Sequence, residues 1–211
     1  SSAASDVYKR QEFNAADIFE GVVDRVPERE AVVYGSTRLT YKELDARSNK
    51  AANALKKIGI KKGSHIGIYA FNCIEWLEIM LGAYKLCAIP ININYRYVEE
   101  ELKYLIDNAD IEAIFYQKQF STKLNNIKND LPLLKHFVSI NDGTDSSDIV
   151  ENNLDFEGLI ANESESRLMV ERSGDDQYIL YTGGTTGMPK GVVWRMEDVL
   201  MTLGGGIDAV T

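Results

Sequence analysis

The chain has 211 residues, of which 45% are hydrophobic and 26% charged, and its formal net charge is −9. This composition is typical of globular proteins and excludes collagen-like, low-complexity and wholly disordered chains. The sequence contains no apolar run of about 18 residues and does not start with a basic-then-apolar signal, so we expect neither a membrane span nor a secretory leader.

The first eleven residues, SSAASDVYKRQ, resemble the in-frame translation of a transposase-based sequencing-library adapter. We therefore expect the native sequence to begin at about Glu12. Residues 1–11 are left out of the reasoning about the fold, as processing segments should be.

Apolar periodicity and cap residues predict a series of helices that alternate with short strands. The first helix begins at Thr40, which forms a capping box with Glu43, and ends near Gly59. Asn72 and Glu75 repeat the cap pattern before a second helix. Further helices are expected over residues 74–86, 99–108, around 120–127 and 197–203. Strands are expected over residues 65–71, 88–93, 111–116, 136–140, 177–181 and 192–194.

This alternation predicts an α/β fold with right-handed crossovers and a doubly wound, mostly parallel sheet flanked by helices. Pro90 in the second strand indicates an edge position or an irregular stretch. Cys73 and Cys87 are the only cysteines, and we expect them to be reduced, buried thiols of a cytoplasmic protein. His65 and His136 have no partners at metal-binding spacing, so structural or surface roles are expected.

The negative charge is concentrated in residues 141–176, which hold eleven acidic residues and only Arg167 and Arg172 as bases. We interpret this stretch as a solvated connection rather than as an acidic interaction surface. The rest of the chain is neutral and lacks a basic stripe, so nucleic-acid binding is not expected.

One segment, residues 181–191, carries recognisable chemistry. It reads YTGGTTGMPKG and directly follows a predicted strand. Glycines let backbone N–H groups approach an anion, threonine hydroxyls bond phosphate oxygens or ligate Mg²⁺, and lysine adds a positive charge. The pattern differs from a Walker A loop, because Pro189 precedes Lys190 and Gly191 follows it. We predict a phosphate-binding loop here rather than a mobile polar turn between strands.

This segment resembles the signature of the adenylate-forming superfamily, Tyr-Thr-Ser-Gly-Thr-Thr-Gly-x-Pro-Lys-Gly, with Gly183 in place of the serine. Residues 39–44 (LTYKEL), 81–90 (LGAYKLCAIP) and 94–102 (NYRYVEEEL) are also similar to motifs of that superfamily. The last of these stretches, and the sequence KGVVWR after the loop, resemble fatty-acyl and steroid-side-chain CoA ligases most. The resemblance covers roughly residues 13–211.

The resemblance implies that residues 12–211 are the N-terminal part of the large AMP-binding domain. The family's Tyr-Gly-x-Thr-Glu adenine segment, its ribose-binding aspartate and its small C-terminal domain are absent from the sequence. The implied activity is an ATP-dependent acyl-CoA synthetase that uses ATP, Mg²⁺ and CoA and activates a fatty or related hydrophobic acid. Such an enzyme needs no transmembrane segment, and peripheral association with a membrane stays open.

The resemblance also assigns the site residues. Lys190 and Thr182 are the expected catalytic residues, and Thr182 is the expected Mg²⁺ ligand. The expected nucleotide-binding residues are Thr182, Gly183, Gly184, Thr185, Thr186, Gly187 and Lys190. Trp194 is expected to pack in the core rather than to gate a tunnel, and Arg96 to form a stabilising ion pair rather than to contact phosphate or CoA.

Two alternatives stay open. The chain could come from another adenylate-forming ligase, such as an aryl-CoA ligase or an acyl-AMP ligase that loads a carrier protein. It could also be a non-catalytic nucleotide-binding remnant or an interaction domain.

Overall fold

The structure is a computed structural model that describes residues 14–145, 148–184 and 187–203. The segment interpreted as adapter-derived, residues 1–11, lies outside the described residues. The helices are α1 (Ala15–Arg25), α2 (Tyr41–Lys57), α3 (Ile74–Leu86), α4 (Glu99–Asn108), α5 (Ser121–Ile127), α6 (Phe156–Ile160) and α7 (Met196–Leu203), with 3-10 turns at Lys118–Phe120 and Lys128–Asp130. The strands are β1 (Glu30–Tyr34), β2 (Thr37–Thr40), β3 (His65–Tyr69), β4 (Ile89–Asn92), β5 (Ile111–Gln117), β6 (His136–Ile140), β7 (Leu154–Asp155), β8 (Gln177–Gly184) and β9 (Gly187–Arg195).

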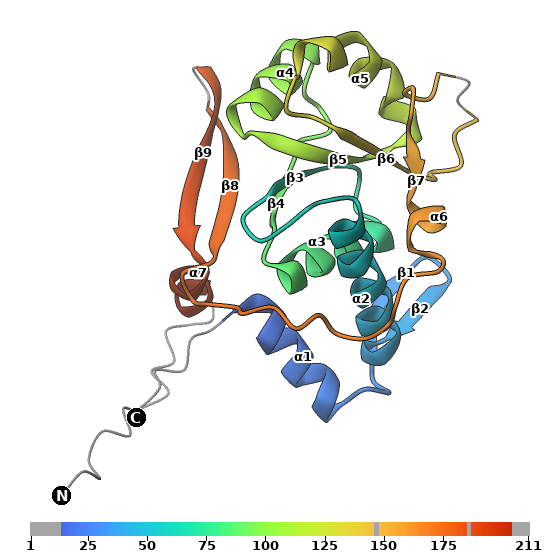
Figure 1. Ribbon diagram of the computed structural model, residues 1–211, viewed down its shortest axis with the longest axis vertical. Helices are drawn as coiled ribbons and strands as arrows, with labels where there is room; N and C mark the ends of the chain where they lie inside the picture. Colours follow the sequence, from blue (N-terminus) through green and yellow to red (C-terminus); the bar gives the residue numbers. More distant parts are fainter. Residues whose placement is uncertain (1–13, 146–147, 185–186, 204–211) are drawn as a thin grey trace, which may run out of the picture.

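A five-stranded parallel sheet forms the centre of the molecule, in the order β4-β3-β5-β6-β7. Figure 1 shows α4 and α5 over one face of this sheet and α2 and α3 over the other. This arrangement confirms the predicted α/β class with a parallel sheet wound on both faces. Strand β4, which contains Pro90, stands at one end of the strand order, as its proline indicated.

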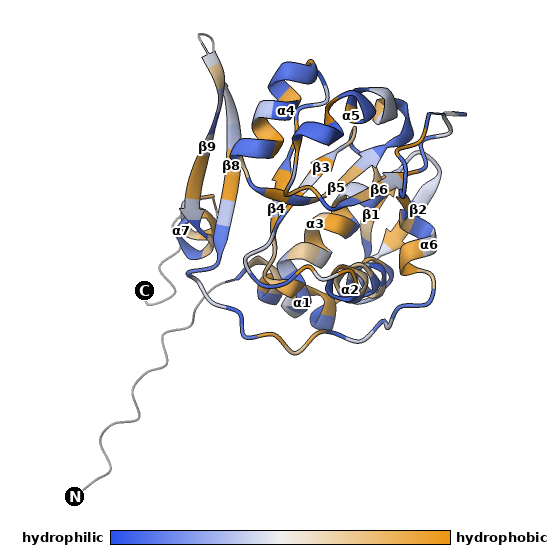
Figure 2. Cartoon of the chain, turned by 45° about the horizontal axis from the view of Figure 1, so that its top comes forward, coloured by the Kyte–Doolittle hydropathy of each residue, from blue (hydrophilic) through white to orange (hydrophobic). Residues whose placement is uncertain are grey.

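The hydrophobic core has two parts, one on each face of the sheet, and strand β5 contributes to both. Its residues Ile114 and Tyr116 join the apolar side chains of α4 and α5, whereas Ala113 and Phe115 join those of α2 and α3. This alternation follows from the two-residue period of a strand. Figure 2 shows the hydrophobic strands enclosed between helices whose outward surfaces are hydrophilic.

The starts of two helices test the cap predictions. Thr40 and Glu43 form the predicted capping box of α2, in which the Glu43 carboxylate accepts from the Thr40 backbone N–H at 2.7 Å. The second cap prediction is wrong by one residue. Helix α3 begins after Cys73, which makes no side-chain cap bond, while Asn72 lines a cavity described below.

Several short elements were not predicted from the sequence. Helix α1 packs beside α2 and α3, and strands β1 and β2 form a separate antiparallel hairpin. Strand β7 and helix α6 lie within the acidic stretch, where Phe156 and Ile160 are buried in the core. None of the described helices is long and apolar enough to cross a membrane.

The acidic stretch is a connection, as expected, but it is not simply solvated. Residues 161–176 run along the outside of α1 and α2 toward β8 (Figure 1), and ion pairs hold them there. Glu163 pairs with Lys57 at 2.5 Å and Glu165 with Lys50 at 3.1 Å. The two basic residues of the stretch, Arg167 and Arg172, form ion pairs with acidic residues of α1. Arg167, for example, lies 2.8 Å from Asp24. Its charge is therefore partly balanced by the body of the protein.

A buried ionic cluster lies where this connection crosses α1, α2 and α3. The ammonium group of Lys85, fully buried, lies 2.7 Å from Asp45 and 2.5 Å from Glu20. Arg172 of the connecting stretch pairs with the same Glu20 at 2.7 Å. Burial raises the pKa of the Glu20 carboxyl, but hydrogen bonds from Arg172 and Lys85 outweigh it and hold that pKa below its usual 4.5.

Candidate functional site

The predicted phosphate-binding segment forms the end of an antiparallel hairpin. Strands β8 and β9 pair from Gln177 opposite Arg195 to Gly184 opposite Gly187. The expectation of a loop is therefore wrong for residues 182–184 and 187–191, and residues 185 and 186 lie outside the described residues. Residues 182–184 continue β8 and residues 187–191 begin β9. Glycine and threonine favoured a loop locally, but pairing with the facing strand decides the backbone conformation.

Thr182 and Lys190 lie directly opposite each other in this hairpin, and both are exposed. Opposite residues of an antiparallel pair project their side chains from the same face. The Thr182 hydroxyl donates a long hydrogen bond of 3.5 Å to the backbone carbonyl of Lys190. Within the described part of the chain, no carboxylate forms an ion pair with the Lys190 ammonium. The hairpin thus presents a hydroxyl and an unneutralised positive charge side by side.

A bulge separates this pair from the end of the hairpin. Met188 and Pro189 of β9 lie opposite the single residue Gly183 of β8. Proline lacks the N–H that a regular ladder requires, and bulges are among the places in sheets that tolerate it. A side-chain carbon added at Gly183 or Gly187 would meet no atom within 4 Å, so their backbones border open space. Thr185 and Thr186, also predicted to bind nucleotide, lie outside the described residues.

A polar cavity of about 290 Å³ opens beside Gly183 and Tyr181. Its other polar lining residues follow β3 and β4: Asn72, Asn92, Asn94, Tyr95 and Tyr97. Ligands of open α/β sheets bind at the carboxyl ends of strands, and this cavity has that position. Sequence reasoning missed the three asparagines, although each lies at or just beyond the end of a predicted apolar strand.

Arg96 lies between Tyr95 and Tyr97, two residues that line this cavity. Its side chain is exposed and lies 5.5 Å from the centre of the Tyr95 ring. Among the residues that the structure describes, none forms an ion pair with it. The described part of the chain thus does not show the predicted stabilising ion pair, and Arg96 is an accessible cation close to the polar cavity.

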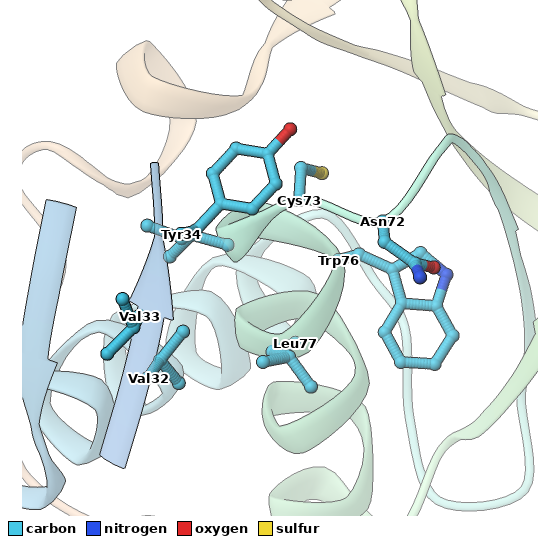
Figure 3. Close-up of a pocket in the computed structure, with 8 residues that line it drawn as sticks. Val32, Val33, Tyr34, Asn72, Cys73, Trp76 and Leu77 are labelled. Carbon is cyan, nitrogen blue, oxygen red and sulfur yellow. The ribbon is translucent and has the colours of Figure 1, made fainter. Parts of the chain in front are cut away.

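A second cavity, of about 310 Å³, lies between strand β1 and the start of α3. It is lined by Val32, Val33 and Tyr34 of the strand and by Cys73, Trp76 and Leu77 at the start of α3 (Figure 3). None of the predicted site residues lines it. Burial raises the pKa of the Cys73 thiol to about 12, so this group stays protonated near neutral pH and is a poor nucleophile.

The remaining sequence candidates have mixed outcomes. Trp194 is 44% exposed on β9, so the expectation that it packs in the core is wrong for the part of the chain described here. Cys87 is buried, as predicted, whereas Cys73 is only half-buried. His65 is half-buried, and its Nδ1 lies 2.6 Å from the backbone carbonyl of Ala109, which confirms a structural role.

The donors at the hairpin fit a polyphosphate. Lys190 supplies a charge, Thr182 a hydroxyl, and Gly183 and Gly187 leave the backbone accessible. A magnesium ion bound to phosphates keeps several waters and takes only one or two protein oxygens. The exposed Thr182 hydroxyl can supply one such oxygen, because a hydroxyl keeps two acceptor lone pairs.

Similarity to known proteins identifies the family of this chain. The family described as AMP-binding enzyme matches residues 19–208. A 3-oxocholest-4-en-26-oate–CoA ligase of Rhodococcus rhodochrous is 45% identical over 94% of this chain and 36% of its own length. A medium/long-chain-fatty-acid–CoA/3-oxocholest-4-en-26-oate–CoA ligase of Mycobacterium marinum is 44% identical over 94% of this chain and 37% of its length. The chain thus spans just over a third of these relatives.

A solved structure extends the similarity to the fold. The anthranilate CoA ligase AuaEII in complex with anthranoyl-AMP superposes with a TM-score of 0.84 at 26% identity. The superposition covers 93% of this chain and 38% of that ligase.

Proposed function

This chain belongs to the family of AMP-binding enzymes, and we propose that the protein containing it is an ATP-dependent acyl-CoA synthetase for a fatty or steroid-derived acid. The observation that carries the proposal is the pairing of Thr182 with Lys190 on one exposed face of a glycine-rich hairpin. The names of the relatives that are 44–45% identical support the choice of reaction and of a hydrophobic acid.

The proposed reaction has two steps. The carboxylate of the acid attacks the α-phosphorus of ATP, which forms an acyl-AMP and releases pyrophosphate. The thiol of CoA then attacks the acyl carbon and displaces AMP. The first step needs no covalent protein nucleophile, so the protein contributes by holding the carboxylate and the phosphorus in line and by neutralising developing charge.

Each residue of the hairpin has a proposed role in the first step. Lys190 holds the β- and γ-phosphates and stabilises the negative charge that develops on the departing pyrophosphate. The backbone at Gly183, Gly184 and Gly187 lies close to the phosphates, where a side chain would intrude. Thr185 and Thr186 donate hydroxyl hydrogen bonds to phosphate oxygens.

Thr182 is the residue that would hold Mg²⁺, through its hydroxyl oxygen. When bound, the ion would neutralise phosphate charge and help to orient the triphosphate. The same hydroxyl lies 3.5 Å from the Lys190 carbonyl oxygen, so the proposed metal position lies close to the backbone of the lysine.

We place the protein in the cytoplasm, because Cys73 and Cys87 are unpaired thiols. The acid and CoA are its proposed small-molecule partners. We also expect peripheral association with a membrane surface, which would give the protein access to a hydrophobic acid.

The alternatives differ in the acceptor and the acid. AuaEII supports the aryl-CoA ligase as the second candidate, since it is a CoA ligase of an aromatic acid with a similar fold. An acyl-AMP ligase would pass the acyl group to a carrier protein instead of CoA. A non-catalytic nucleotide-binding protein would bind ATP without turnover.

Release of AMP by the full-length protein separates these functions. We expect AMP release that requires both CoA and a fatty or steroid acid. Preference for benzoate-like acids would indicate the aryl-CoA ligase, and acid-dependent adenylate formation that CoA does not accelerate would indicate the acyl-AMP ligase. ATP binding without AMP release under any of these conditions would contradict the proposed synthetase.

A further inference from the structure

The phosphate hairpin, formed by β8 and β9, contacts the rest of the molecule mainly through β8, which packs beside β4, whereas β9 contacts α4. Strands β8 and β9 form their own two-stranded sheet, and a two-stranded hairpin is marginally stable alone. Ile179 joins the main core near the start of β8, whereas Val192, Val193 and Trp194 of β9 are exposed. Figure 1 shows the hairpin standing beside α4. Contacts between the hairpin and α4 therefore bear directly on where Lys190 lies.

One side-chain hydrogen bond makes this contact. The Tyr181 hydroxyl donates to the amide oxygen of Asn108 at 2.8 Å. Asn108 is the last residue of α4, and 73 residues separate it from Tyr181. Burial raises the pKa of the Tyr181 phenol, so the hydroxyl stays protonated and remains a donor at neutral pH.

The Tyr181 ring also contacts the facing strand, β9. Tyr181 pairs with Gly191 in the hairpin, and its ring lies against the glycine backbone. A side-chain carbon added at Gly191 would lie 2.9 Å from ring atom Cζ, closer than real side-chain carbons come, and 3.0 Å from Cε2. Glycine at position 191 is therefore required for the ring to occupy this position.

Lys190 directly precedes Gly191 in β9. Its carbonyl accepts from Thr182, the residue after Tyr181. A chain of contacts thus runs from Asn108 through the Tyr181 hydroxyl and ring to Gly191, and from there to the backbone of Lys190.

We propose that Asn108 and Tyr181 are positioning residues that fix the phosphate hairpin against α4 and thereby place Lys190 for ATP. This inference rests on the proposed function and adds two residues outside the phosphate-binding positions. Neither residue needs to touch the nucleotide, because both act through the backbone of Lys190.

Steady-state kinetics of the full-length protein test the inference. We expect Asn108→Ala and Tyr181→Phe each to raise the KM for ATP by about three- to tenfold, the range of one hydrogen bond. The KM for the acid stays unchanged. Asn108→Asp, which keeps an acceptor oxygen, restores the KM for ATP. The double variant has the same KM for ATP as either single variant, because both substitutions remove the same hydrogen bond. Tyr34→Phe, an exposed tyrosine on β1, is the matched control and leaves both constants unchanged.

The outcomes distinguish failure of this inference from failure of the proposed function. If Lys190→Ala impairs ATP use but Asn108→Ala and Tyr181→Phe do not, the positioning role is overturned and the function stands. If Asn108→Ala lowers only kcat, with both KM values unchanged and no rescue by Asn108→Asp, the role is merely structural and the inference is wrong. If Lys190→Ala has no effect, both are overturned.

Discussion

Replacing Lys190 with alanine is expected to lower the rate of adenylation in the full-length protein by about tenfold or more. Lys190 is exposed on the same face as Thr182, and within the described residues no carboxylate neutralises it. Its removal takes away the positive charge nearest the predicted phosphates. The measurement is the initial rate of pyrophosphate release at varied ATP concentration.

Lys56→Ala serves as the matched control, since Lys56 is an exposed lysine at the end of α2, away from the hairpin. We expect its rate to equal that of the wild type. Lys190→Arg keeps the charge but changes its geometry. Its rate of pyrophosphate release should lie between those of the wild type and Lys190→Ala. Equal rates for Lys190→Ala and Lys56→Ala would show that Lys190 does not take part in adenylation.

The second large effect concerns stability and arises at Lys85. Lys85→Met is expected to lower the free energy of unfolding by about 3–5 kcal/mol, the range for removing one partner of a buried ion pair. The substitution leaves the carboxylates of Glu20 and Asp45 without their buried ammonium partner. The measurement is the midpoint of urea unfolding, compared with that of the wild type.

Lys57→Met is the control for this change, because Lys57 is 68% exposed in its pair with Glu163. Exposed pairs contribute about 0–1 kcal/mol, so its midpoint should stay near that of the wild type. Similar losses for the two variants would show that burial of Lys85 does not decide its contribution.

The loss of stability in Lys85→Met is expected to become smaller at acidic pH. The pKa of Glu20 is lower in the folded protein than its usual 4.5. A carboxyl with a lowered folded pKa stabilises the fold above its unfolded pKa, and this contribution disappears as the pH falls through the folded value. The stability difference between wild type and Lys85→Met should therefore be constant near neutral pH and narrow below about pH 4.5. A difference that stays constant down to pH 3 would exclude Glu20 as the partner responsible.

The parts of the fold that were predicted correctly are those set by local signals. The capping box at Thr40 and Glu43 and the apolar periods of α2, α3 and α4 involve residues close in sequence. Their predicted ends agree with the structure to within a residue or two. The parallel sheet followed from the alternation of helices and strands, because parallel neighbours need a crossover.

The parts that were missed depend on distant partners. Residues 182–191 have the composition of a loop, yet residues 182–184 and 187–191 lie in strands because Thr182 pairs with Lys190 across the hairpin. The acidic stretch carries no local sign that Glu163 and Arg167 face Lys57 and Asp24. The candidate site was found through a family signature. The contact of Asn108 with Tyr181 and the grouping of the three asparagines around the cavity arise only in the folded chain.

The most direct test of the account is exchange of labelled pyrophosphate into ATP, catalysed by the full-length protein with and without a carboxylic acid. The account predicts exchange that depends on a fatty or steroid acid and needs no CoA, since the adenylation step alone is reversible. Absence of exchange with every acid tried, or exchange at the same rate without any acid, would contradict the claim that this hairpin serves the activation of a carboxylate.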